Sequence, residues 1–512
     1  MARSLMVVGT ASDVGKSVVC TALCRIFSQD GYRVAPFKGQ NMSLNSAVTP
    51  SGAEIGRAQA VQAEACGILP NEHMNPVLLK PTNEHRTQVI VQGRVHATIS
   101  ARDYFHSEKS ELWKAVVESL RYLQDHYDLV VMEGAGSPVE MNLKERDITN
   151  MRAAEMADAA VLLVVDIERG GVFAAVVGTL ALLAPHERNR VKGIIINKFR
   201  GDPRLFDEGV TMLQNLAGIP VLGVIPFMAD LGIEAEDSLA LAKPRYQRTE
   251  VRRSDILRIV VVNLPHLANF TDLDPLFLEF DAEVSFTQKP SDLEGSDAVV
   301  LGGTKNTMDD LVWLEQTGWM TALQKFALHG GAVLGICGGF QMMGQRVVDP
   351  TGQESNRLES PGIGLFSYHT VLTAQKRTRL VEGVIHARPY QGISISGYEI
   401  HMGETTDVMP DQVFAVVGSH PVDLWSDGVS TGDGAIVGTY LHGIFHNDAF
   451  RTAWLNRLRL RKGMPEGPVE IRTAEVKAKN YDRLAHVVRS HLDMQKLYHI
   501  LADNRVPERG AL

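Results

Sequence analysis

A cysteine in a glycine-rich turn carries the strongest chemical signal in the sequence. The segment GAVLGICGGFQMMG places Cys337 directly after an apolar run, between Gly335 and the pair Gly338 and Gly339. A sharp turn from strand to helix strains the backbone, and small neighbours let a substrate approach closely. The N-terminus of the following helix lowers the pKa of a thiol and offers amides to an oxyanion. We therefore predict that Cys337 is a nucleophile, because a buried structural cysteine would not need three glycines.

A nucleophilic cysteine needs a general base, and His442 in GTYLHGIFHN is the candidate. It follows a predicted strand, and base and nucleophile need only be neighbours in space. His446 in the same segment and His401 in GYEIHMG are competitors, since a lone histidine is most often structural. We expect a thiolate–imidazolium pair formed by Cys337 and His442.

A second chemical signal is the glycine-rich loop GTASDVGKSVV near the N-terminus. Amides of such a loop and of the helix after it bind phosphate, and the helix dipole favours the negative charge. Lys16 is expected to reach the β- and γ-phosphates of ATP, and Ser17 to place its hydroxyl on Mg²⁺. Five residues lie between Gly9 and Gly15 instead of the usual four, so the loop is a variant. The alternative is a glycine turn that caps an ordinary helix.

Acidic residues end two of the predicted strands of the first half of the chain. Glu133 in DLVVMEGAGS lies where ligands bind in open α/β sheets, and a carboxylate there can hold Mg²⁺. Asp166, at the end of VLLVVD, is a second candidate. A buried helix cap is the plain alternative for Glu133. Cys20 and Cys24 are interpreted as core packing, because a structural zinc site has four ligands.

These groups must be positioned by parallel sheets. Short apolar runs alternate with helical patterns, which predicts an α/β fold of two domains, each a mainly parallel sheet with helices on both faces. The charged stretch after the first set of strands is interpreted as a linker. We expect a P-loop domain at 1–235, a linker at 236–255, a second α/β domain at 256–460 and a C-terminal helical segment at 461–512.

Composition narrows the class of protein. The chain has 512 residues with a net charge of −9, which argues against a nucleic-acid partner. Its four cysteines form no disulfide framework or zinc pattern, so we expect a reducing, cytoplasmic location. The short apolar N-terminal run resembles a first strand more than a signal peptide, and no apolar stretch is long enough for a membrane span. Oligomeric state stays open, with a homo-oligomer as one alternative.

The two halves resemble two known families of domains. The first resembles the dethiobiotin-synthetase-like P-loop enzymes, which use the five-residue loop. This resemblance implies that Lys38 in PFKGQN and Asn197 in INKF bind the nucleotide. The second half resembles class I glutamine amidotransferases, which implies that its nucleophile attacks the glutamine side-chain amide. Gly303 in VLGGTKNT and Gly338 would then supply the oxyanion amides. Ile444 stands where that family commonly has a glutamate, so the third member of the triad is missing or supplied elsewhere, as in the cobyrinate-type branch.

Longer motifs narrow the resemblance further. PFKGQNMSLNS, MEGAGSPVEMNL, VVDIERGGVFA, GICGGFQMMG and SGYEIHMG together resemble the cobyric acid synthase family of cobalamin biosynthesis, over nearly the whole chain. That family is a glutamine-hydrolysing, ATP-dependent ligase that amidates four peripheral carboxylates of adenosylcobyrinic acid a,c-diamide to adenosylcobyric acid. The resemblance implies ATP and Mg²⁺ as cofactors and glutamine and a corrinoid as small-molecule substrates. The cobalt would arrive inside the corrin, so no protein-bound cobalt or zinc is expected.

The corrinoid is expected at the carboxyl edge of the first sheet. The residues that we expect near it are Gln40, Asn41, Asn45 and Asp147, and a solvated loop charge is the alternative for Asp147. The closest rival activity is cobyrinic acid a,c-diamide synthase, with the same two domains. A P-loop regulatory ATPase is a rival of a different class, but it would have no use for Cys337 and His442.

Overall fold

The first domain is built on a parallel sheet. In the computed structural model, which describes residues 2–83, 86–106, 109–229, 231–234, 256–420, 423–469 and 471–503, six strands form this sheet. Their spatial order is β12 (Val221–Pro226), β11 (Val191–Phe199), β10 (Ala160–Asp166), β1 (Arg3–Gly9), β9 (Leu129–Glu133) and β2 (Val34–Phe37). Every pairing is parallel, so the carboxyl ends of β1, β2 and β9 meet at one edge.

Helices cover both faces of this sheet, as parallel strands require. One face packs against α4 (Ser110–His126), α5 (Met151–Met156), α6 (Val172–Leu182) and α8 (Asp207–Ala217). The other face packs against α1 (Lys16–Gln29), whose buried residues include Cys20 and Cys24. The expected role of these two cysteines in core packing agrees with their complete burial.

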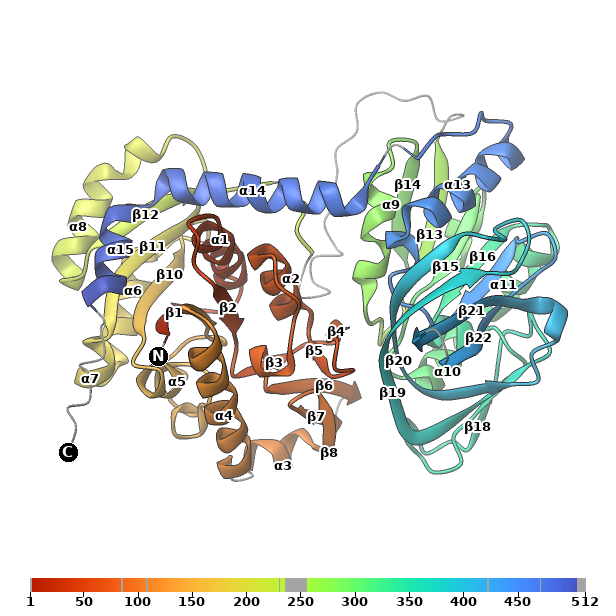
Figure 1. Cartoon of the computed structure of the whole chain (residues 1–512), viewed down its shortest axis with the longest axis horizontal. Helices are drawn as coiled ribbons and strands as arrows, with labels where there is room; N and C mark the ends of the chain where they lie inside the picture. The colour runs from red at the N-terminus through yellow and green to blue at the C-terminus, as the bar shows by residue number, and fades with distance from the viewer. Residues whose placement is uncertain are drawn as a thin grey trace.

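Two small sheets project from the first domain toward the second. One has the order β3 (Gln40–Met42), β6 (Val77–Asn83), β7 (Arg86–Val91) and β8 (Arg94–Ser100). The other is the hairpin of β4 (Ser46–Val48) and β5 (Glu54–Gly56), followed by α2 (Arg57–Cys66). Figure 1 shows these strands between the main sheet and the second domain.

Among the residues that the structure describes, the second domain has one sheet of eleven strands. Its parallel part has the order β14 (Ala282–Thr287), β13 (Leu257–Val262), β15 (Ala298–Leu301), β16 (Ala332–Ile336) and β23 (Ile436–Thr439). Beyond β23 come β22 (Asp423–Ser430), β21 (Val413–His420) and β19 (His369–Ile385), and the pairings from β23 to β19 are antiparallel. β20 (Ser394–Thr406), which is antiparallel to β19, β17 (Arg346–Val348), which is parallel to β19, and β18 (Glu359–Pro361) complete the sheet. The fold class is confirmed, and the antiparallel extension is an addition that the sequence analysis did not foresee.

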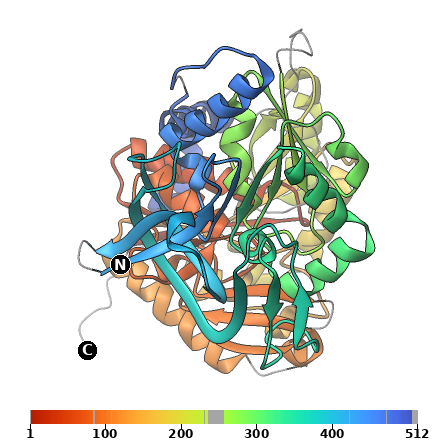
Figure 2. The same ribbon diagram turned by 90° about the vertical axis from the view of Figure 1, so that its right-hand side faces the viewer.

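Helices also cover both faces of the second sheet. One core contains residues of α10 (Thr307–Gln316), α11 (Trp319–Leu328) and α12 (Gly338–Met342). The opposite core contains residues of α9 (Asp274–Leu278) and α13 (Asp448–Lys462). Figure 2 shows the second domain facing the viewer, with the first domain behind it.

The last two helices return to the first domain. α14 (Thr473–His491) starts beside the second domain and runs along α1, as Figure 1 shows. Leu484, Val488, Leu497 and Leu501 of α14 and α15 (Met494–Asp503) are buried in the same core as Val19 of α1. The C-terminal segment is therefore part of the packing of the first domain.

One sequence expectation concerns residues that the structure does not describe. The predicted linker at 236–255 lies outside the described residues, and the predicted domain boundaries stay predictions. No helix of the described residues has both the length and the apolar character needed to cross a membrane. Within the same residues, no group of three or more histidine, cysteine, aspartate or glutamate side chains could hold a metal ion.

Candidate active sites

Cys337 occupies a strained turn between β16 and α12. Its φ is +53° and its ψ −109°, a backbone conformation that non-glycine residues rarely adopt. The Cys337 amide donates to the carbonyl of Thr439 at the end of β23, at 2.8 Å, which fixes the turn to the neighbouring strand. A Cβ at Gly339 would lie 2.1 Å from the carbonyl oxygen of Leu301. The predicted need for small residues around Cys337 therefore has a direct steric cause.

His442 lies beside Cys337 and is held by a carboxylate that the sequence analysis missed. His442 Nδ1 donates to Asp272 Oδ2 at 2.6 Å, and the amide of Gly443 donates to Asp272 Oδ1 at 3.0 Å. Both side chains are buried. Nδ1 is thereby occupied, so Nε2 is the nitrogen left to exchange a proton with the thiol.

The electrostatics of this group favour an imidazolium. Burial by itself lowers the pKa of His442, but the charges of Asp272 and Cys337 and hydrogen bonds to both raise this pKa to about 10. The thiolate–imidazolium pair expected for a cysteine nucleophile is thus supported by a third residue. Asp272, Cys337 and His442 have the arrangement of a catalytic triad.

A cavity of about 50 Å³ adjoins the thiol, and both Cys337 and His442 line it. Gly303 lines it too, and a Cβ there would lie 3.0 Å from Cε1 of His442. Gly338 opens α12, where a Cβ would lie 2.5 Å from the side chain of Thr304. Gly303 and Gly338, the two residues predicted to supply oxyanion amides, therefore flank the predicted nucleophile.

The two competing histidines have other partners. His401 Nδ1 donates to the carbonyl of Gly403 at 2.7 Å, and its ring stacks on Tyr440 with centroids 3.8 Å apart. His446 Nε2 lies 3.2 Å from the carbonyl of Thr271. His401 also lines the cavity of the thiol, and its Nε2 lies 3.6 Å from Glu399 Oε2. The interaction of His442 with both Cys337 and Asp272, which raises the pKa of His442, favours His442 over both competitors.

The phosphate loop has the expected strand–loop–helix setting. Gly15 caps α1 with a φ of +98°, and a Cβ there would lie 2.1 Å from Asn197 Nδ2. Asn197 itself is buried, and its Nδ2 donates to the carbonyl of Val14 at 2.9 Å. This hydrogen bond holds the phosphate loop against the end of β11. Lys16 Nζ donates to the carbonyls of Ala11 and Gly136, each at 2.9 Å. The expected contact of Asn197 with the nucleotide stays a prediction.

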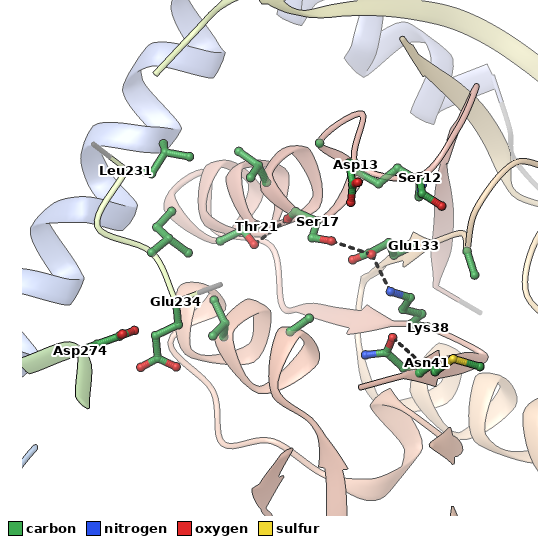
Figure 3. Close-up of a pocket in the computed structure, with 18 of the residues that line it drawn as sticks. Ser12, Asp13, Ser17, Thr21, Lys38, Asn41, Glu133, Leu231, Glu234 and Asp274 are labelled. Atoms are coloured by element: carbon green, nitrogen blue, oxygen red, sulfur yellow. Dashed lines mark hydrogen bonds and ion pairs between the residues drawn. The ribbon is translucent and has the colours of Figure 1, made fainter. Parts of the chain in front are cut away.

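Glu133 collects the polar groups at the carboxyl edge of the first sheet. Its Oε1 accepts from Ser17 Oγ at 2.8 Å and from Lys38 Nζ at 2.9 Å, and its Oε2 accepts from Gln62 Nε2 at 2.6 Å. Figure 3 shows Ser17 and Lys38 pointing at this carboxylate from different directions. The alternative metal ligand Asp166 is instead paired with Lys198 at 2.9 Å.

A cavity of about 970 Å³ opens beside these groups and reaches the second domain. The phosphate loop lines it, as do Gln40 and Asn41. Asp274 and Glu234 border the same cavity in Figure 3. The other two residues expected near the substrate have different surroundings.

Asn45 is buried, and its carbonyl accepts from the amide of Arg57 at 3.1 Å. The Asp147 carboxylate accepts from the amides of Thr149 at 2.8 Å and Asn150 at 3.1 Å. Burial raises the pKa of this carboxyl against those hydrogen bonds. A substrate role for Asn45 and Asp147 stays a prediction.

Comparisons with known proteins agree with this two-site arrangement. Residues 5–240 match the model of a CobQ/CobB/MinD/ParA nucleotide binding domain. Residues 258–450 match the model of a CobB/CobQ-like glutamine amidotransferase domain. The triad and the phosphate loop fall in separate matched regions.

Curated relatives match the chain from end to end. Cobyric acid synthases of Citrobacter koseri and Klebsiella pneumoniae subsp. pneumoniae are each 46% identical, and that of Salmonella agona is 45% identical. Each alignment covers 99% of this chain and 100% of the relative. The chain belongs to the cobyric acid synthase family. Membership in this family confirms the expected class of enzyme, a glutamine-dependent amide ligase.

Sequence reasoning missed one residue of the glutaminase site, Asp272, which holds His442. It lies in ANFTDLDP, far before His442 in the chain. Class I amidotransferases commonly have the third member of the triad just after the histidine. Here Ile444 occupies that position and is completely buried in the apolar core. Two acidic residues in one short apolar segment were the available signal, and spacing alone could not connect either of them to His442.

Proposed function

We propose that this chain uses ATP and glutamine to convert four peripheral carboxylates of adenosylcobyrinic acid a,c-diamide into amides, giving adenosylcobyric acid. The observation that carries the proposal is the presence of two chemically distinct sites in one chain. One is the triad of Cys337, His442 and Asp272, and the other is the phosphate loop with Glu133. The full-length similarity to cobyric acid synthases supports the choice of substrate.

At the first site the thiolate of Cys337 attacks the side-chain amide of glutamine. His442 Nε2 protonates the ammonia that leaves, and water then cleaves the thioester to give glutamate. Amides of Gly303 and Gly338 are placed to stabilise the oxyanion. Lys305 and Glu354, which also line the cavity, supply one cation and one anion for the carboxylate and ammonium of the amino acid. Burial raises the pKa of Glu354 to about 7 against the charge of Lys305 and two amides, so binding of an ammonium there would favour its ionised form.

At the second site a substrate carboxylate attacks the γ-phosphate of ATP, giving an acyl phosphate and ADP. Ammonia then displaces phosphate and forms the amide. Gly9, Gly15 and Lys16 would cradle the phosphates, with Lys38 nearby and Asn197 holding the loop. Ser17 and Glu133, 2.8 Å apart, fit a Mg²⁺ site, and the ion would neutralise phosphate charge when bound.

The large cavity supports a bulky acceptor. Its volume of about 970 Å³ is at the upper end of the range for small-molecule sites. Gln40 and Asn41 offer amide groups in the wall of this cavity. Asn45 and Asp147 also belong to the proposed substrate region. A cytoplasmic location is also part of the proposal, since Cys20, Cys24, Cys66 and Cys337 are all free thiols.

The test is to incubate the protein with ATP, Mg²⁺ and glutamine labelled with ¹⁵N in its side-chain amide, together with a panel of corrinoid acids. We expect four labels per molecule of the a,c-diamide. Two labels on cobyrinic acid and none on the a,c-diamide would instead indicate the a,c-diamide synthase, and absence of any amide would refute the ligase. The matched control is Cys337→Ser, which should take label from ammonium salts and not from glutamine.

A further inference from the structure

The main chain of Ser46 connects the two domains at a buried point. Ser46 belongs to β4 of the first domain, and both of its main-chain polar groups bond to side chains of the second domain. Its amide donates to Asn269 Oδ1 at 2.9 Å, and its carbonyl accepts from the hydroxyl of Tyr398 at 3.3 Å. Ser46, Asn269 and Tyr398 are all buried. The orientation of Asn269 is set by this contact, because its oxygen must face the amide of Ser46.

Both partners of Ser46 also touch the imidazole of His442. Asn269 Nδ2 lies 3.4 Å from His442 Nε2, the nitrogen that must serve Cys337. The Tyr398 ring stacks on His442 with centroids 5.1 Å apart and an interplanar angle of 16°. Tyr398 and His442 also exchange main-chain hydrogen bonds of 2.9 and 3.3 Å. One residue of the first domain therefore reaches the ring of the general base through two side chains.

The contact with Asn269 disfavours a proton on Nε2 of His442. With its oxygen on Ser46, Asn269 presents its amino group to Nε2, which suits a nitrogen that accepts a hydrogen bond. An imidazolium carries a proton on Nε2 and meets a second donor there. Asn269 holds a φ of +52°, which asparagine tolerates better than most residues. Moving Ser46 would free the Asn269 side chain and remove the opposing donor.

The segment that carries Ser46 begins in the large cavity. Gln40 and Asn41 line that cavity, and Ser46 follows only a few residues later. The hydroxyl of Ser46 is itself held, since it donates to Glu54 Oε1 at 2.8 Å and accepts from Lys80 Nζ at 2.9 Å. A ligand in the cavity that shifts β3 would pull on β4 and on its hydrogen bonds to the second domain.

We propose that Asn269 and Tyr398 are positioning residues that couple occupancy of the first-domain site to the glutaminase, with Asn269 restraining His442 until the main chain of Ser46 moves. The inference rests on the proposed function, because it needs two sites whose activities must be matched. Restraint of this kind would prevent glutamine from being hydrolysed when no acyl phosphate is ready. Two-site coupling in proteins is typically worth about 5–150-fold in affinity, and we expect stimulation of hydrolysis within that range.

The experiment measures glutamine hydrolysis with and without ATP, Mg²⁺ and the corrinoid acceptor. For the unmodified chain we expect stimulation of about fivefold or more. Tyr398→Phe keeps the stacked ring and loses only the hydroxyl, so its stimulation should fall. The double variant Asn269→Ala/Tyr398→Phe severs both contacts, and its two rates should become nearly equal through a higher rate without acceptor. Ser51→Ala, in the turn of the same β4–β5 hairpin, is the matched control and should keep the unmodified stimulation.

Three results would overturn the inference. They are an unstimulated parent chain, a parent-like ratio in the double variant, and loss of hydrolysis by both variants under both conditions. The last result would make Asn269 and Tyr398 part of the catalytic alignment only. Amide synthesis from ammonium salts is measured in parallel, because its absence from the unmodified chain would refute the proposed function itself. Its presence in the variants would show that their first domain is intact.

Discussion

Asp272 holds His442 and the turn that carries it with the two oxygens of one carboxylate. The contact to His442 Nδ1 measures 2.6 Å, and that to the amide of Gly443 measures 3.0 Å. Asp272 lies in a short 3₁₀ helix, Phe270–Leu273, directly before α9. The orientation of the imidazole therefore depends on a segment far from the histidine in sequence.

Replacing Asp272 should change the pH dependence of glutamine hydrolysis. The raised pKa of His442, about 10, favours the imidazolium through neutral pH, against the donor that Asn269 presents to Nε2. In Asp272→Asn, burial still lowers this pKa and the charge of Asp272 no longer raises it, so the alkaline limb should move to lower pH by about 1–3 units. The check is the pH profile of hydrolysis, and Asp274→Asn should leave the limb in place. An unmoved limb in Asp272→Asn would contradict the triad.

The same group should affect stability with a definite sign. A histidine whose folded pKa is raised stabilises the fold fully below its unfolded pKa, about 6.5. That contribution is lost as pH rises through the folded pKa of about 10. Thermal unfolding of the parent and of Asp272→Asn should therefore differ most at or below pH 6 and converge at alkaline pH.

A single methyl group should disable the glutaminase. The added Cβ of Gly303→Ala would lie 3.0 Å from His442 Cε1 and 3.2 Å from the carbonyl of Ala268. Displacement of the base should lower hydrolysis by about 100-fold, with ammonia-driven synthesis unchanged. Gly432→Ala is the control, since no heavy atom lies within 4 Å of its added Cβ. Equal rates of glutamine hydrolysis in Gly303→Ala and Gly432→Ala would show that Gly303 is not part of the site.

Loss of Lys16 should affect the other site only. Lys16→Ala should abolish amide synthesis from both glutamine and ammonia, by about 1,000-fold or more, because charge neutralisation dominates phosphoryl transfer. Glutamine hydrolysis without acceptor should continue. Lys192→Ala, at an exposed position of β11, serves as the control. Amide synthesis that persists in Lys16→Ala would refute the role of the phosphate loop.

A buried ion cluster at the domain contact should matter for stability. Glu54 pairs with Lys80 at 2.8 Å and with Lys376 of the second domain, and these charges hold its pKa low despite burial. Glu54→Gln leaves two buried lysines without their anion, which should cost about 3–5 kcal/mol. The measurement is the urea concentration at which the domain contact becomes sensitive to protease. Glu404→Gln removes an exposed partner of Arg377 and should change little.

The elements that carry the chemistry were predictable because their signals are local. Apolar runs such as the one before Gly9, and the glycines around Cys337, satisfy backbone and burial requirements within a few residues. Lys16, Ser17 and Cys337 could therefore be proposed as site residues without a fold. Asp272, Asn269 and Tyr398 could not, because their roles arise only when distant segments pack together.

The second sheet shows the same limit. Its parallel strands are buried on both faces and read as continuous apolar runs. β19 is long and alternates buried and partly exposed residues only over its first few positions, and its pairing with β20 depends on contacts that no local pattern specifies. The antiparallel extension consequently escaped prediction, although Ile400 of β20 supplies the carbonyl that accepts from the Cys337 thiol at 3.3 Å.

The return of α14 and α15 has a consequence for synthesis on the ribosome. Leu484, Val488, Leu497 and Leu501 fill the side of the first domain that α1 alone leaves open. In a nascent chain, this apolar surface would therefore stay exposed to solvent until the entire second domain has been translated. A premature stop codon near position 470 would keep every side chain that we propose to be catalytic and would still yield an aggregation-prone product.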